Sequence, residues 1–159
     1  MHKPLHPVSR DLALLIGRIA IAAVFIPAGF AKLLSVGDFI ASLDARGVPY
    51  ATVLAPLGAT IEFLGGMAVL FGVQVRFAAF LLIVFTVIAT LIAHRFWEFE
   101  GAARQSQQSQ FLKNFAIIGG YVLLMATGSG RYSLERLWKG RDMRRLPGRR
   151  ASDQAVAAS

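Results

Sequence analysis

A single carboxylate, Glu62, lies near the centre of a long apolar stretch at residues 56–73, which reads PLGATIEFLGGMAVLFGV. A charge at such a depth in a hydrophobic segment is costly unless it is paired, protonated or turned toward a wet cavity. Three other long apolar stretches accompany it along the chain. The sequence therefore predicts a small membrane protein whose helices surround a polar interior.

Composition supports this class of protein. Of the 159 residues 55% are hydrophobic, against about 45–50% in soluble domains, and the mean hydropathy is +0.56. Four spans of ~20 residues fit this length, so we predict an all-α integral membrane four-helix bundle. We expect a lead at residues 1–11, a four-helix domain at 12–137 and a basic, disordered tail at 138–159. The predicted spans are residues 12–34, 53–73, 77–93 and 111–127.

Residue types that are missing or scarce exclude several chemistries. The chain has no cysteine, which excludes thiol redox chemistry and disulfides within it. With only three histidines, we expect neither a haem nor a metal site. The net charge is +8, and eight of the 17 lysines and arginines lie from Arg131 onward. Without a recognition motif, this asymmetry indicates membrane topology and no nucleic-acid partner.

The cations also predict an orientation. With four spans, both termini lie on one side of the membrane, and the positive-inside rule assigns the more cationic side to the cytoplasm. We therefore expect cytoplasmic termini and a multi-pass protein of a bacterial inner membrane. The terminal side carries Lys3, Arg10, Arg76 and the eight C-terminal cations, whereas the opposite side carries Arg46, Arg95 and Arg104.

The connections differ in composition. Residues 38–46 have an apolar side typical of a short interfacial helix. Residues 98–110 are polar and glutamine-rich, which favours an exposed loop, although the residues before Phe111 could extend the fourth span. A short surface helix is expected at 132–138. Pro27 is expected to kink the first span.

Two charged residues lie well inside the spans. Glu62 is roughly 14 Å deep from the outer side, and Arg18 is roughly 9 Å deep from the cytoplasmic side, at ~1.5 Å per residue. One interpretation is a structural Glu62–Arg18 ion pair that fixes helix register. The other is that Glu62 handles protons in a cavity, because the protonation of a carboxyl group responds strongly to burial.

Four more polar residues lie near the outer ends of the spans. Each has an ordinary structural interpretation: lysines snorkel to the interface, histidine lies at the surface, and asparagine bonds a neighbouring helix. Together they could line a cavity for an anionic or quinone oxygen, with imidazole and carboxylate moving protons. The candidate catalytic residues are Glu62 and His94, and the candidate ligand-binding residues are Arg18, Lys32, Lys113 and Asn114.

The order of these segments resembles the DoxX family of small bacterial inner-membrane proteins. The segments are GRIAIAAVFIPAGFAKL, APLGATIEFLGG, ATLIAHRFWEF and QFLKNFAIIGGYVLL. The resemblance covers residues 12–137 and implies four transmembrane helices in the inner membrane. The family takes its name from a subunit associated with a terminal quinol oxidase. Some relatives are linked to thiol-oxidative-stress complexes, and many are described only as oxidoreductases, so the resemblance also implies a membrane oxidoreductase or a subunit associated with one. The lack of cysteine disfavours direct thiol chemistry in this chain.

Three functions remain open at this point. The first is a redox-associated, quinone-linked membrane component, with quinone as its cofactor or substrate and other membrane redox proteins as partners. The second is a non-enzymatic membrane subunit or scaffold, which the glycine-rich helix faces favour. The third is a small-molecule channel or transporter, which would need a homo-oligomer because four helices enclose little space.

Overall fold

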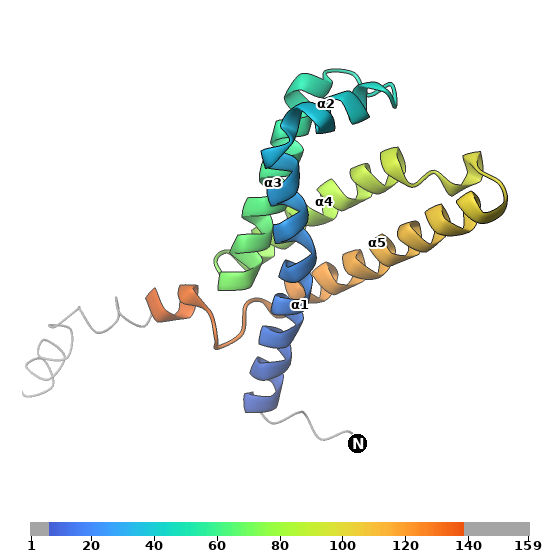
Figure 1. The fold of residues 1–159 in the computed structure, drawn as a ribbon. Coiled ribbons are helices and arrows are strands. Elements are labelled where there is room, and N and C mark those ends of the chain that lie inside the picture. Colours follow the sequence, from blue (N-terminus) through green and yellow to red (C-terminus); the bar gives the residue numbers. More distant parts are fainter. Residues whose placement is uncertain (1–6, 139–159) are drawn as a thin grey trace, which may run out of the picture.

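The structure is a computed structural model that describes residues 7–138, and this part contains helices and no strand (Figure 1). The predicted lead falls partly, and the predicted tail almost wholly, outside the described residues. The short surface helix predicted at 132–138 is present over residues 134–138. The main elements are α1 (Pro7–Leu34), α2 (Val36–Asp44), α3 (Ala51–Phe71), α4 (Val75–Ala93), η1 (Phe96–Glu98) and α5 (Gly101–Thr127).

Four of these helices, α1, α3, α4 and α5, are long and apolar enough to cross a membrane. The all-α membrane architecture predicted from the sequence is therefore confirmed. A helix, α2, is present where the short connecting helix was predicted, although it begins at Val36 instead of residue 38. Helix α1 continues through Pro27 without ending there.

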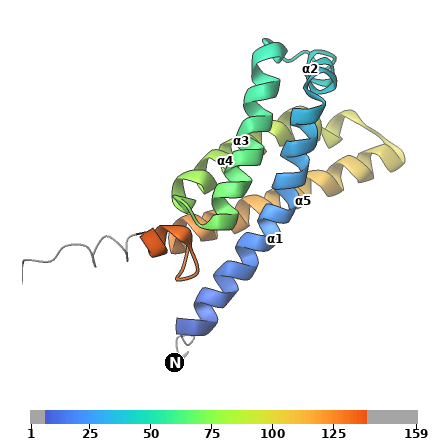
Figure 2. The same cartoon turned by 60° about the vertical axis from the view of Figure 1, so that its left-hand side comes forward.

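The spanning helices form two antiparallel pairs. Helix α1 packs mainly against α3, and α4 packs mainly against α5, while the pairs meet chiefly through α3 and α4. Figures 1 and 2 show that the pairs are inclined to each other. They lie close together near the α3–α4 turn and diverge toward the ends that carry α2 and η1 (Figure 1).

The prediction of a loop at residues 98–110 is wrong, because α5 begins at Gly101. The alternative, that residues before Phe111 extend the fourth span, is confirmed. Alanine, arginine and glutamine have good helix propensity, so this polar composition is compatible with an exposed helix. Phe111 of α5 stacks edge-on against Phe96 and Trp97 of η1 and joins the ends of the second pair. The polar composition of residues 98–110 therefore indicated that the segment is exposed, and it did not indicate that the segment lacks a helix.

Helices α1 and α3 approach most closely at glycines. A β-carbon at Gly29 would lie 2.5 Å from the backbone nitrogen of Phe63, and one at Gly66 would lie 3.2 Å from the Phe25 β-carbon. Arg18 and Phe25 are buried on the same side of α1, as their spacing with Gly29 predicts. This contact sets the register between α1 and α3, and with it the partners of every polar residue on α1.

Candidate functional site

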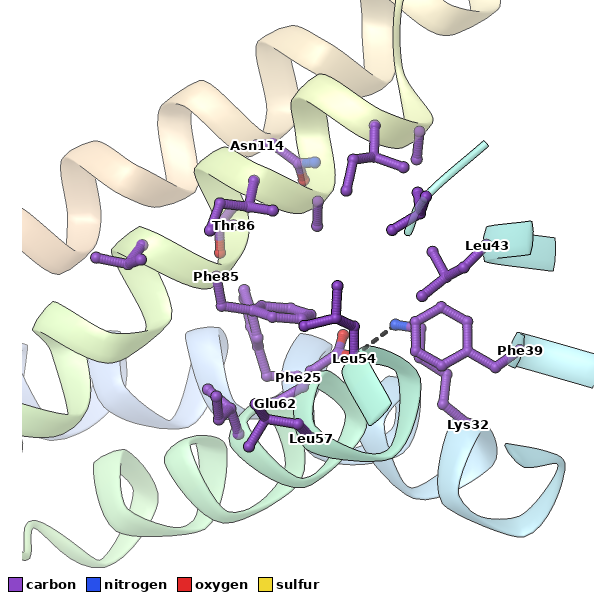
Figure 3. A pocket seen from close by; sticks show the side chains of 18 of the residues that line it. Phe25, Lys32, Phe39, Leu43, Leu54, Leu57, Glu62, Phe85, Thr86 and Asn114 are labelled. Atoms are coloured by element: carbon purple, nitrogen blue, oxygen red, sulfur yellow. Dashed lines mark hydrogen bonds and ion pairs between the residues drawn. The ribbon is translucent and has the colours of Figure 1, made fainter. Parts of the chain in front are cut away.

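A cavity of about 490 Å³ lies where the two helix pairs diverge (Figure 3). Its lining comes from all four spanning helices and from α2. Most of the lining side chains are apolar, and aromatic rings of Phe25, Phe39 and Phe85 face the space. The polar groups among them are Lys32, Ser42, Arg46, Glu62, Thr86, His94 and Asn114.

An ion pair between Lys32 and Glu62 forms one wall. The Lys32 Nζ atom donates a hydrogen bond to the Glu62 carboxylate at 2.5 Å. The Glu62 side chain is only 7% exposed, whereas that of Lys32 is 33% exposed. The Lys32 ammonium also lies 5.6 Å from the ring centre of Phe39 on α2. The pair satisfies the buried carboxylate and leaves the ammonium accessible from the cavity.

The predicted Glu62–Arg18 ion pair is wrong. Gly29 packs against Phe63, so Arg18 lies eleven residues along α1 from the level of Glu62, which corresponds to about 16 Å. The depths of Arg18 and Glu62 in the membrane were each estimated within a single span. Those estimates did not include the register between α1 and α3, which the Gly29–Phe63 contact sets.

The partners of Arg18 are instead backbone carbonyl oxygens. It is 1% exposed and donates four hydrogen bonds of 2.5–2.8 Å. We call this arrangement the Arg18 clasp. It provides further donors to carbonyl groups near the end of α3, and it ties the segment after α5 to α3. The acceptors are Val69 and Leu70 near the end of α3, and Ser129 and Tyr132 after α5.

The second helix pair contributes a wall of its own. The His94 Nδ1 atom lies 2.8 Å from the Gln107 Oε1 atom of α5. The Asn114 side-chain amide donates to the Thr90 hydroxyl at 2.8 Å. Lys113 is exposed and contacts Gln110. The fold therefore brings Lys32, Glu62, His94 and Asn114 to one cavity, and it places Arg18 and Lys113 outside the lining.

Sequence reasoning missed two threonines on α4. Thr86 lines the cavity and is 3% exposed, and Thr90 connects Asn114 to α4. The available signal was a pair of hydroxyl residues four positions apart in an otherwise uncharged, apolar span. Among residues 7–138, no group of three or more histidine, aspartate or glutamate side chains is placed to hold a metal ion.

Comparison with known proteins gives a consistent result. A family model described as DoxX matches residues 13–95. "Inner membrane protein YqjF" of Escherichia coli (strain K12) is 35% identical over 127 residues, covering 80% of this chain and 92% of the relative. "Inner membrane protein YphA" of the same organism is 31% identical over 128 residues, covering 80% and 91%. No solved structure matches the chain.

Proposed function

The chain belongs to the DoxX family and is a multi-pass inner membrane protein, and we propose that it binds a quinone in the cavity between its two helix pairs. In this role it would be a redox-associated membrane component. The observation that carries the proposal is the cavity itself, in which a largely apolar, aromatic lining surrounds the Lys32–Glu62 pair. Ligand sites commonly combine an apolar wall with a few convergent polar groups.

The mouth of the cavity favours a ligand that arrives from the lipid. Leu57 on α3 and Ile88 on α4 both line the cavity, and they are 51% and 53% exposed. In a bilayer such side chains face acyl chains, so a lipophilic molecule could enter sideways between the helix pairs. If the termini are cytoplasmic, as the charge distribution predicts, the cavity lies in the periplasmic half of the membrane.

The polar groups suit the chemistry of a quinone. A bound quinone supplies two-electron, two-proton redox chemistry. Lys32 has three N–H donors, of which one is used by Glu62, so another could bind a ligand oxygen. Glu62 and His94 would hold and transfer protons, and Asn114 would fix the second wall. Another membrane redox protein would supply or accept the electrons.

A scaffold is the second candidate function, and α5 favours it. Of its residues only Tyr121 and Leu124 are buried. Phe115 and Leu123 are among the large apolar side chains that it exposes. A face of this kind could pack against a helix of a partner protein. A stoichiometric partner that copurifies in the absence of any quinone would favour this second function.

The proposal is tested on protein purified with native lipid. Quinone content and the Kd for an added short-chain quinone would be measured for wild type, Glu62→Gln and His94→Ala. We expect wild type to retain quinone and both variants to fold but bind more weakly. Lys32→Met, which removes the ammonium donor, is measured in the same way. Lys113→Met is its matched control, because Lys113 lies outside the cavity lining. Wild-type protein that neither retains nor binds quinone would refute the proposal.

A further inference from the structure

Thr86 differs from three of the other threonines inside the described helices. Thr60, Thr90 and Thr127 each donate a hydrogen bond to the backbone carbonyl four residues earlier, at 2.6–2.7 Å. The hydroxyl of Thr86 is fully buried, and it has no hydrogen-bond partner. A threonine in a helix can readily satisfy itself through its own backbone, so the exception at Thr86 requires a cause.

The environment of Thr86 sharpens this contrast. The backbone carbonyl of Thr86 accepts a hydrogen bond from the Thr90 hydroxyl. The Thr90 hydroxyl in turn accepts a hydrogen bond from the Asn114 side-chain amide. The Asn114–Thr90 bond joins α5 to α4 beside the cavity, and neither bond provides a partner for the Thr86 hydroxyl. Buried polar groups are nearly always hydrogen-bonded, and a buried hydroxyl in apolar surroundings is costly unless a ligand or water completes it.

Thr86 also lies on the opposite wall from the ion pair. Figure 3 shows it on α4 near Asn114, with the Lys32–Glu62 pair across the space and the ring of Phe85 between them. The cavity thus has two polar ends separated by apolar surface. One end offers an ammonium donor, and the other offers a hydroxyl donor.

We propose that the Thr86 hydroxyl donates a hydrogen bond to a second oxygen of the cavity ligand. The ligand is then a ring with acceptor oxygens at two opposite positions, one for Lys32 and one for Thr86. A 1,4-quinone ring has this form, whereas a fatty acid or phospholipid has its oxygens at one end. This inference rests on the proposed function and adds to it the residue that recognises the far side of the ring.

Two probes and a set of threonine variants test this inference. The probes are a decyl-substituted 1,4-benzoquinone and a decyl-substituted cyclohexenone that has a single carbonyl. Thr86→Val removes the hydroxyl and keeps the shape, and Thr86→Ser keeps a hydroxyl. Thr60→Val is the control, because it removes a hydroxyl that is satisfied within its own helix and lies outside the cavity lining.

We expect Thr86→Val to weaken binding of the quinone about tenfold, the effect of losing one hydrogen bond. Binding of the single-carbonyl probe should change less than about twofold, and Thr86→Ser should restore quinone binding. Thr60→Val should bind like wild type. If Thr86→Val does not fold, Thr86→Ala takes its place, with Thr86→Ser again as the hydroxyl-bearing reference.

Two results would overturn the inference while leaving the proposed function intact. One is that Thr86→Val binds the quinone as tightly as wild type does. The other is that it weakens both probes equally, which would mean that the Thr86 hydroxyl does not recognise a second ligand oxygen. Failure of wild-type protein to bind the quinone would overturn the proposed function and this inference together.

Discussion

The two ends of the molecule each hold a cation from α1, and the groups around that cation differ. At the closed end, the Arg18 clasp uses four backbone carbonyls, and the guanidinium is 1% exposed. At the open end, Lys32 has one carboxylate partner and borders a cavity of about 490 Å³. The number and kind of acceptors around each cation thus distinguish a structural role for Arg18 from a candidate binding role for Lys32, although both residues lie on one face of α1.

The largest expected effect is at the closed end. Arg18→Met removes four hydrogen bonds to backbone carbonyl oxygens, so we expect the free energy of unfolding to fall by about 4 kcal/mol. Denaturation in mixed micelles measures this loss. Quinone binding per folded molecule should remain within about threefold of wild type, because Arg18 lies outside the cavity lining. Loss of binding in a variant that is still folded would break the distinction between the two ends.

At the open end, Lys32→Met leaves the Glu62 carboxylate buried without its partner. We expect the free energy of unfolding to fall by about 3 kcal/mol and quinone binding to weaken at least tenfold. The double variant Lys32→Met/Glu62→Gln should regain most of the stability, because the unpaired charge is gone, but it should not regain binding. Recovery of binding in the double variant would show that the pair has only a structural role.

Between the two ends, Gly29→Ala tests the contact that sets the register. The added methyl group would meet the backbone of Phe63, so we expect a loss of about 2 kcal/mol in stability. Because the helices must separate beside Glu62, ligand binding should weaken as well. Gly17→Ala is the control, since nothing lies within 4 Å of its added β-carbon. Equal thermal midpoints for the two variants would contradict this account of the register.

The smallest expected effect concerns the second helix pair. Gln107→Ala removes the partner of the His94 ring, and we expect a loss of about 1 kcal/mol in stability for this half-exposed hydrogen bond. Quinone binding should weaken by only about two- to threefold, because His94 itself remains. His94→Ala should weaken binding more than Gln107→Ala does, and the reverse order would show that Gln107 is the residue that matters.

The sequence allowed the spans and much of the site to be predicted, because those depend on local composition. Three polar residues lie near the outer ends of the predicted spans, namely Lys32, His94 and Asn114. The fold brings them to one cavity with Glu62. The partner of Glu62 could not be predicted, since it depends on how α1 and α3 slide past each other, which is set by the Gly29–Phe63 contact.

Other features were hidden for different reasons. The polar start of α5 was interpreted as a loop because composition reports exposure more directly than backbone shape. Thr86 was overlooked because a threonine in a helix usually satisfies its own hydroxyl. Only the neighbouring contacts reveal that this one does not.

The aromatic cluster of Phe96, Trp97 and Phe111 has a kinetic consequence for the proposed function. Aromatic residues of this kind mark the membrane–water boundary, so His94, two residues before Phe96, lies near bulk water. Protons would then arrive from the water past His94, while the ligand would arrive from the lipid between Leu57 and Ile88. Reactants with separate entrances do not compete for entry, so saturation with one would leave the arrival rate of the other unchanged.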